Sequence, residues 1–272
     1  MFSPFLKLVL AVIFLIVIVT RTQARELRVC ADPNNMPFSN MKQEGYENRI
    51  AAIVAKDLRA HLVYVWQRMG RGFVREYLGK SRCDLLIGIP SNYRPVLTTT
   101  PYYRSAYVFV FRRGQKFDLA SGFDSPELQR LKIGVQVLEE EYTPPGEALA
   151  RRGLQRAIFG FDTTGDGADS IIRAVATGQV DLAVVWGPLA GYFGKKYRGG
   201  LTLKLVEPEV DPPGLPFTFA ISMGVRKGNI ALRDELETIL ARRQSEIRRI
   251  LDQYGIPQLP TASFASSSST VD

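Results

Sequence analysis

A short apolar strand followed by a polar, aromatic loop constrains the fold of this chain most. Residues 85 to 89 are apolar, contain Gly88 and end at Pro90, a pattern typical of a strand covered on both faces in an α/β sheet. The loop that follows, residues 91 to 105, combines polar and aromatic side chains. Open α/β sheets hold their ligands at the carboxyl ends of the strands. The sequence therefore predicts a ligand cleft beside this loop.

Residues 1–24 are typical of a secretory signal peptide. Lys7 precedes an apolar run from Leu8 to Val19, and residues 22 to 24 supply a small-residue cleavage site. A retained membrane anchor is the alternative, but the run is shorter than the ~20 apolar residues that a spanning helix needs. We therefore expect a periplasmic protein, secreted through the inner membrane, with no membrane attachment after signal cleavage.

The charge of the chain gives little indication of its partners. The formal net charge is +8, yet the basic residues are scattered and form only small clusters. Basic residues interleaved with aromatic residues in a nucleic-acid-binding motif are absent from the sequence. We therefore expect no nucleic-acid partner.

The chain contains two cysteines, Cys30 and Cys83. Disulfides persist in exported proteins, and both residues lie at or beside predicted parallel strands. A disulfide forms if the strand geometry lets the two sulfurs meet. Two buried free thiols are the alternative, and the sequence leaves both open.

The first third of the mature chain predicts a βαβαβ unit. We expect strands over residues 27–31, 62–66 and 84–89, with helices over 45–60 and near 73–78. Right-handed crossovers would place the three strands side by side in a parallel sheet. A fourth strand, over 107–111, leads out of the unit.

A second α/β unit begins after residue 114. Its expected strands cover 131–137, 157–161, 180–185 and 201–206. A helix over 170–177 would have Asp169 as its N-cap and Gly178 just past its end. A proline-rich link, 208–216, leads to a strand over 218–225 and a last helix over 230–254.

This order predicts two lobes. The first comprises residues 25–111 plus 219–260, and the second, 112–218, is inserted into it. The two strand crossings would act as a hinge, and the lobes would close over a ligand between them. The serine-rich residues 261–272 are expected to form a disordered tail.

The order of several motifs resembles a known family. DLLIGIP, TTTPYYRS, LKIGVQ and GQVDLAVVWGP are similar to the family-three periplasmic solute-binding proteins of ABC transporters. More narrowly, RVCADPNNMPFSN, RGFVREYL and VVWGPLAGYF resemble the J proteins of methanol oxidation systems (MoxJ and XoxJ). The resemblance implies an α/β, two-lobed periplasmic binding protein-like fold of type II, in which each lobe is a mostly parallel sheet flanked by helices.

The resemblance also implies a function. J proteins are encoded beside quinoprotein methanol dehydrogenases, so it implies a periplasmic accessory factor of a PQQ-dependent methanol dehydrogenase, with that enzyme as partner. The factor would bind the dehydrogenase or assist its maturation or activation, with no catalytic residue, metal or cofactor of its own. The alternative is the substrate-binding protein of an ABC transporter for a small solute.

The same family resemblance suggests site residues. Amino-acid-binding members hold the ligand carboxylate with an arginine after the third strand, a role that transfers to Arg94. Where those members pair the ligand ammonium with an acidic residue, this chain has Trp186. A free amino acid is therefore a doubtful ligand, and aromatic side chains favour a small apolar ligand or a protein segment. The residues predicted to line the cleft are Asp32, Asn34, Phe38, Trp66, Arg71, Tyr93, Arg94, Tyr102, Tyr103, Arg104 and Trp186.

Each of these residues also has a structural interpretation. The aromatic residues are also suited to fill the core, Arg94 to hold a loop, and Arg68 and Arg71 to form a solvated turn. Asp32 and Asn34 commonly bond the backbone in turns. The acidic run 139–141 is interpreted as a solvated loop. With His61 as the sole histidine, histidine triads and multi-histidine metal sites are excluded.

Overall fold

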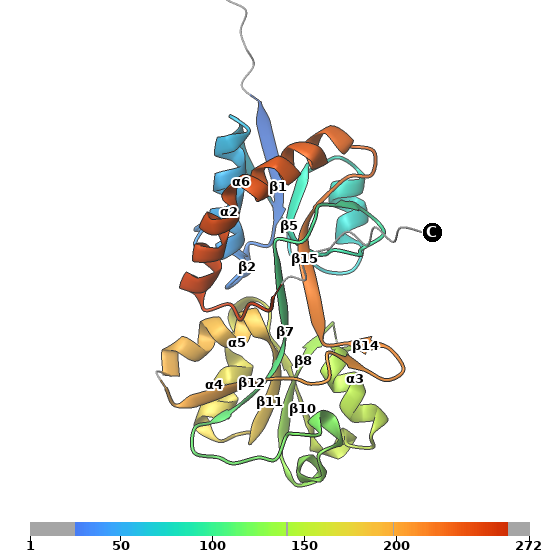
Figure 1. Ribbon diagram of the computed structural model, residues 1–272, viewed down its shortest axis with the longest axis vertical. Coiled ribbons are helices and arrows are strands. Elements are labelled where there is room, and N and C mark those ends of the chain that lie inside the picture. The colour runs from blue at the N-terminus through green and yellow to red at the C-terminus, as the bar shows by residue number, and fades with distance from the viewer. Residues whose placement is uncertain (1–24, 140, 198, 261–272) are drawn as a thin grey trace, which may run out of the picture.

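The computed structural model describes residues 25–139, 141–197 and 199–260. These residues form an elongated molecule with two lobes, joined by strands that run through both (Figure 1). The expected signal peptide, 1–24, and the expected disordered tail, 261–272, lie outside the described residues. Among the residues that are described, no helix is both long and apolar enough to cross a lipid bilayer.

The first lobe contains the predicted parallel sheet. Its strands lie in the order β4 (His61–Trp66), β1 (Glu26–Ala31) and β5 (Leu85–Pro90), and all three are parallel, which confirms the predicted arrangement. Helices α2 (Tyr46–Asp57) and α6 (Ile230–Tyr254) pack on one face, and a π-helical turn (Arg75–Gly79) lies against the other. Three very short strands complete the lobe: β2 (Asn34–Asn35), β3 (Ser39–Asn40) and β6 (Leu97–Thr98).

The second lobe has a mixed sheet. Strands β10 (Ile158–Asp162), β8 (Ile133–Leu138) and β11 (Leu182–Trp186) are parallel, whereas β12 (Leu201–Leu205) pairs antiparallel with β7 (Tyr103–Arg112). Helices α3 (Pro144–Arg151), α4 (Ser170–Thr177) and α5 (Gly187–Gly194) flank it. The remaining elements are β9 (Glu141–Tyr142), β13 (Val210–Asp211), β14 (Leu215–Pro216) and 3₁₀ turns at Gly122–Asp124, Pro126–Arg130, Gln155–Ala157, Gly165–Gly167 and Lys195–Tyr197.

Helix α4 has the predicted bounds, but its N-terminus differs in detail. Gly178 ends the helix in the left-handed conformation, with φ of 79°, as expected. Asp169 occupies the N-cap position, yet its side chain makes no capping hydrogen bond. Its carboxylate instead pairs with Arg173 and Lys196. The ion pairs with two nearby cations take the place of the expected cap.

Strands β7 and β15 (Thr218–Val225) connect the lobes (Figure 1). Tyr103 to Ala106 of β7 pair antiparallel with β15, whereas Tyr107 to Phe111 pair with β11. Strand β15 continues beside β5 in the first lobe. Strand β7 thus pairs with a strand of each lobe in turn. The lobe bounds at 111 and 218 stay a prediction.

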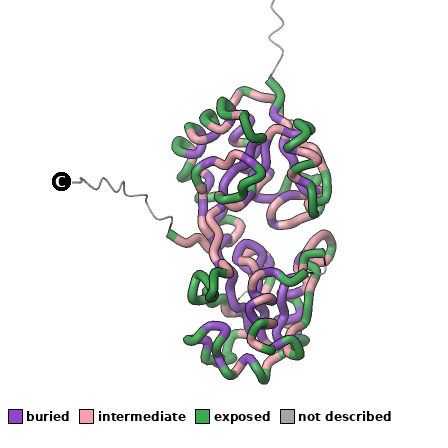
Figure 2. Tube along the Cα trace, turned by 90° about the vertical axis from the view of Figure 1, so that its right-hand side faces the viewer, coloured by how far each residue is buried: buried purple, intermediate pink, exposed green. Residues whose placement is uncertain are grey.

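Each lobe has its own core, and both cores are buried along the central strands (Figure 2). In the first lobe, Leu27 and Val29 of β1 pack against Ile50 and Val54 of α2, whose spacing of four residues places them on one helix face. In the second lobe, the alternating residues of β7 serve both faces of the sheet: Phe109 packs on one face and Val108 on the other.

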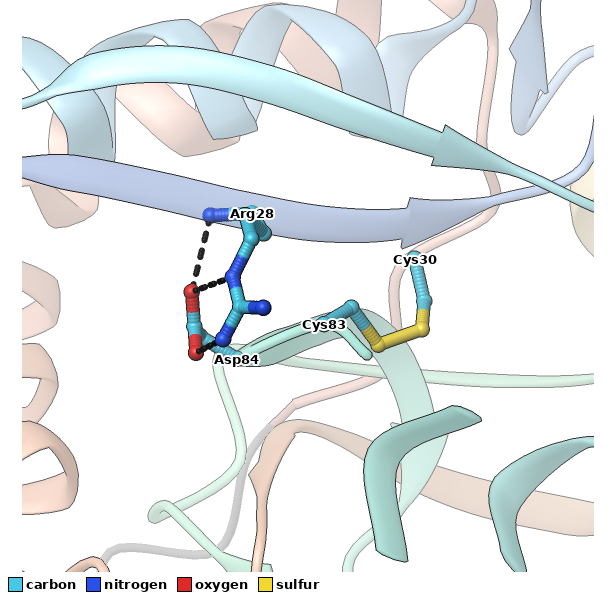
Figure 3. Close-up of a disulfide and its surroundings, with 4 residues drawn as sticks. All are labelled: Arg28, Cys30, Cys83 and Asp84. Atoms are coloured by element: carbon cyan, nitrogen blue, oxygen red, sulfur yellow. Dashed lines mark hydrogen bonds and ion pairs between the residues drawn. A yellow bond between two sulfur atoms is a disulfide. The ribbon is translucent and has the colours of Figure 1, made fainter. Parts of the chain in front are cut away.

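A disulfide joins Cys30 at the end of β1 to Cys83 just before β5 (Figure 3). The two Cα atoms are 5.5 Å apart, within the range that a disulfide spans. Beside it, the Arg28 guanidinium donates to both oxygens of Asp84, at 3.0 and 2.7 Å. The disulfide interpretation is thus confirmed, and both links hold the first and third strands of the unit together.

Candidate ligand cleft between the lobes

A cavity of about 390 Å³ lies between the lobes, where the carboxyl ends of the strands of both sheets meet. Residues of β5, β7, β11 and β15 line it together with the loop after β1 and the first turn of α2. The sequence predicted a ligand between the two lobes, where this cavity lies, but of the loop 91–105 only Tyr103 lines it. We refer to this cavity as the interlobe cleft. Its lining residues are Asp32, Asn35, Phe38, Ser39, Glu47, Met69, Gly88, Pro90, Tyr103, Tyr107, Gln136, Leu138, Thr143, Thr163, Thr164, Trp186, Leu189, Phe219 and Ile221.

Four of the predicted residues line the interlobe cleft: Asp32, Phe38, Tyr103 and Trp186. The hydroxyl of Tyr103 lies 2.9 Å from that of Tyr46 in α2, which fixes the ring against the first lobe. Asp32 is buried, and its carboxylate accepts from the backbone N–H groups of Asn34 and Met69, at 2.9 and 2.8 Å. Asp32 therefore combines both interpretations, because it organises its loop and also faces the cleft.

Aromatic rings form a large part of the cleft wall. The ring of Trp186 lies 5.4 Å from that of Tyr107 and 5.7 Å from that of Phe219, both edge to face. These three rings come from β11, β7 and β15, so the crossing strands themselves carry the wall. Edge-to-face pairs hold their rings in fixed orientations. This aromatic wall is therefore preformed, because its rings hold one another in place without a ligand.

The polar side chains of the second lobe that face the cleft are occupied by internal hydrogen bonds. Gln136 accepts from the backbone N–H of Trp186 at 2.5 Å and donates to the Thr163 hydroxyl at 2.8 Å. The Thr143 hydroxyl donates to the backbone carbonyl of Gln136 at 2.9 Å. Gln136 thus fixes the backbone at Trp186, where β11 ends and α5 begins. None of these three polar residues was predicted to line the cleft, although Gln136 ends the motif LKIGVQ.

Glu47 is the most notable side chain that the sequence did not indicate. It lies in the first turn of α2, half-buried, and its carboxylate lies against Gly88 of β5. Burial, together with the nearby charge of Asp32, raises the pKa of Glu47 to about 8. An acidic residue in the first turn of a helix usually faces solvent and stabilises the helix dipole. Glu47 lines the cleft because its side chain lies against β5, at Gly88, and not in open solvent.

Polar contacts between the lobes surround the mouth of the cleft. Arg71 of the first lobe pairs with Glu139 at 3.4 Å and with Glu141, and Arg68 donates to the Thr164 hydroxyl at 3.1 Å. The side chain of Asn34 donates to Asp166 at 2.9 Å. Asn34 and Arg71 therefore lie at the rim, outside the lining. Glu139 and Glu141, which belong to the acidic run expected to form a solvated loop, are exposed but take part in these contacts.

The other five predicted residues lie outside the cleft. Trp66 ends the edge strand β4 and stacks on Tyr64, with the ring centroids 4.6 Å apart. The Tyr102 hydroxyl donates to the Ile87 carbonyl, and Arg104 pairs with Glu209 at 2.9 Å. Neighbouring residues of a strand point to opposite faces, so Arg104 leaves the cleft that Tyr103 lines. Trp66, Tyr102 and Arg104 therefore have structural roles, which corrects the expectation that they line the cleft.

Arg94 and Tyr93 lie on an exposed loop. After β5, Ser91 bonds the Ala220 carbonyl and the chain turns back to pair β6 with β15. This return directs residues 92 to 95 to the outer surface of the first lobe. The carboxylate-binding role that the resemblance transferred to Arg94 therefore has no support in its position.

A larger groove, of about 850 Å³, lies on the first lobe outside the interlobe cleft. Four basic residues line it, together with two aromatic residues and apolar side chains. Arg226 and Lys227, in the turn between β15 and α6, are exposed. We refer to it as the basic groove. Its charged and aromatic lining residues are Arg71, Phe73, Arg75, Tyr93, Arg226 and Lys227.

The arrangement of two lobes, crossing strands and a cleft agrees with comparisons with known proteins. Residues 27–257 match the family described as bacterial extracellular solute-binding proteins, family 3. The chain belongs to this family. The match covers both lobes, so the family assignment applies to the whole described fold and not to one unit.

Individual relatives narrow the assignment to the MoxJ and XoxJ type. Protein MoxJ of Paracoccus denitrificans is 31% identical over 252 residues, which cover 87% of this chain and 90% of the relative. The crystal structure of MxaJ from Methlophaga aminisulfidivorans MPT is similar with a TM-score of 0.76, 28% identity and coverage of 86% of this chain and all of that one. The periplasmic binding protein XoxJ from Methylobacterium extorquens AM1 gives a TM-score of 0.69, 37% identity and the same coverage.

Proposed function

We propose that the protein is a periplasmic accessory factor of a PQQ-dependent (quinoprotein) methanol dehydrogenase. It would bind the dehydrogenase or assist its maturation or activation, without chemistry of its own. The likeness to MoxJ of Paracoccus denitrificans over nearly the full length of both chains carries this proposal. The similarity to the XoxJ and MxaJ structures supports it, because these relatives share both lobes with the chain.

The geometry favours the outer surface as the site of contact with the dehydrogenase. The interlobe cleft, at about 390 Å³, is at the small end of the ~300–1,000 Å³ typical of small-molecule pockets. Ion pairs of Arg71 and Arg68 with the second lobe surround its mouth. A folded partner or a long segment has little room there. The basic groove is larger, and among its described basic residues Arg226 and Lys227 form no ion pair, so it suits an acidic segment of the dehydrogenase.

An association experiment tests this proposal. The mature chain would be mixed with its cognate dehydrogenase, and complex formation would be followed by light scattering at low and high salt. The double variant Arg226→Glu with Lys227→Glu should weaken the complex, because it reverses two charges of the basic groove. The matched double variant Arg248→Glu with Arg249→Glu places the same change on the exposed face of α6 and should have little effect.

A deletion strain gives the second measurement. Dehydrogenase activity in the periplasm should fall when the gene is removed, and the wild-type chain should restore it. Normal activity in the deletion strain, together with no detectable complex, would show the proposal to be wrong.

The second candidate function is the receptor of a transporter for a small solute. The interlobe cleft favours it, because the cavity is bounded by residues of both lobes and the crossing strands allow a hinge. Loss of uptake of one solute in the deletion strain, with dehydrogenase activity unchanged, would favour the receptor. Stabilisation of the purified chain by that solute would support the same conclusion.

A further inference from the structure

One carboxylate in the interlobe cleft has no partner. Within the described part of the chain, Glu47 accepts no side-chain hydrogen bond or ion pair, although its backbone N–H bonds the Phe38 carbonyl at 3.0 Å. The other acid of the cleft, Asp32, is satisfied by two backbone N–H groups. The Glu47 carboxylate is half-buried and lines the cavity without a protein partner, so it is free to pair with a cationic group of a ligand.

The ionisable side chains that line the cleft are acidic. Asp32 and Glu47 are its acidic residues, and no arginine or lysine is among the described residues that line it. The arginines nearest the mouth are directed to acids of the second lobe: Arg71 to Glu139 and Arg68 to Asp162. A ligand with a carboxylate would therefore meet no compensating cation, and it would be repelled by Glu47 once that acid ionises.

The aromatic wall suits a cation as well as an apolar group. Phe38, Tyr103, Tyr107, Trp186 and Phe219 all line the cavity in which Glu47 lies. The faces of aromatic rings carry partial negative charge and attract ammonium groups, with Trp the strongest. The same rings offer apolar contact to the body of a ligand. The combination of an unpaired carboxylate with several rings differs from the lining expected for a neutral apolar compound.

We propose that the interlobe cleft binds a small organic cation, an ammonium group on an apolar body without a carboxylate. The ammonium pairs with Glu47, and the rings of Trp186, Tyr107 and Phe219 surround the apolar body. No guanidinium is among the described residues of the lining, which separates this ligand from a free amino acid. Binding of such a cation does not require the dehydrogenase, so its test is separate from the test of the proposed function.

Calorimetric titration of the full mature chain tests the charge preference. The probes are cyclohexylammonium and benzyltrimethylammonium, with cyclohexanol, benzyl alcohol and cyclohexanecarboxylate as neutral and anionic counterparts. We expect the cations to bind at least about ten-fold more tightly than the neutral compounds. The anion should bind least. Equal binding of a neutral counterpart, tighter binding of the anion, or no binding of either cation would overturn the proposal.

The variant Glu47→Gln identifies the residue responsible. It preserves the size of the side chain and removes its charge, so the cation preference should be lost. The matched control Glu44→Gln changes an exposed acid three residues earlier that does not line the cleft, and it should bind as the wild type does. Thermal unfolding of both variants verifies that they are folded. Retained cation preference in folded Glu47→Gln would also overturn the proposal.

The pH dependence gives a readout that a merely structural role would not produce. Benzyltrimethylammonium keeps its charge at every pH, so any change in affinity comes from the protein. Pairing requires ionised Glu47, whose pKa is raised to about 8, so affinity should increase up to about ten-fold per pH unit below that value and then level off. The titratable groups that face Glu47 are Asp32 and four tyrosines. Burial raises the pKa of each tyrosine, so Tyr46, Tyr64, Tyr102 and Tyr103 stay neutral in this range. An affinity independent of pH would contradict the assigned pairing.

Discussion

The carboxylate of Glu47 lies so close to Gly88 that a β-carbon at residue 88 would overlap its Oε1 atom. Helix α2 and strand β5 meet here, and the glycine leaves the space that the acid occupies. Gly88 was noted in the sequence only as an interruption of an apolar strand. In the fold, it makes room for a cleft residue, so an interruption of the strand pattern coincides with the candidate site.

The stability of the protein should decrease as the pH rises through the range in which Glu47 ionises. Its pKa is about 8 in the folded chain against 4.5 ordinarily, so the folded state holds the proton more tightly. Stability is therefore greatest below about pH 4.5 for this group and is lost progressively up to about pH 8, by at most about 1.4 kcal/mol per pH unit. Urea unfolding of the wild type and Glu47→Gln at about pH 5 and about pH 8.5 measures the difference.

Glu47→Gln should flatten this part of the pH profile, whereas Glu44→Gln should retain it. The Gln variant should also be the more stable protein at the higher pH, because it buries no charge. An identical decline in the wild type and Glu47→Gln would show that another group is responsible.

The variant Gly88→Ala should weaken cation binding with little loss of stability. The added methyl group meets the far end of a flexible side chain, so the Glu47 carboxylate is displaced while the backbone is unaffected. Gly88 also has no left-handed conformation that would oppose alanine. We expect a reduction in affinity of about ten-fold. Calorimetric titration with benzyltrimethylammonium measures it.

A matched glycine variant controls for the loss of backbone freedom. In Gly194→Ala, the new β-carbon would have only an ordinary contact, 3.8 Å from Leu203. That variant should bind as the wild type does. Unchanged affinity in Gly88→Ala would indicate that the Glu47 carboxylate takes no part in binding.

Regular elements were predictable because their signals are local. Helices α4 and α6 and strand β15 have the predicted bounds, since apolar periodicity, a C-terminal glycine and the flanking prolines all act within a few residues. Helix α5 was missed because it starts at Gly187-Pro188 and has a second glycine in its centre, which are turn signals. Its formation depends on burial against the sheet of the second lobe, which is a tertiary effect.

The candidate site was predictable only in part. Asp32 and Phe38 follow β1, Trp186 ends β11, and Tyr103 begins β7 after the loop that follows β5. All four were predictable because ligands of open α/β sheets bind beside the carboxyl ends of such strands. Arg94 follows such a strand as well, but the pairing of β6 with β15 carries its loop outward. Glu47 depends on the distance between a helix and a strand that lie about forty residues apart in sequence. No local pattern encodes that distance.

Removal of the disulfide should destabilise the first lobe. Cys30 and Cys83 close a loop with a sequence separation of 53, which corresponds to about 4 kcal/mol in the chain-entropy description. The double variant Cys30→Ala with Cys83→Ala should lose about this free energy of unfolding in urea. Wild-type protein unfolded with and without a reductant is the control, and the reduced form should agree with the variant. An unchanged midpoint in both would contradict the contribution of the bond.

The variant Arg71→Ala should shift the lobes toward an open arrangement with little change in the stability of either lobe. Arg71 connects the first lobe to Glu139 and Glu141 across the mouth of the cleft, but 70% of its side chain is exposed. Exposed ion pairs contribute little to folding, whereas a hinge between two lobes responds to small differences in free energy. Small-angle X-ray scattering should therefore show a larger radius of gyration for the variant, and high salt should have the same effect on the wild type.

Arg75→Ala removes a neighbouring arginine that pairs with Glu76 within the same lobe, so it should scatter as the wild type does. Equal radii for the wild type and Arg71→Ala would mean that the rim contacts do not hold the lobes together.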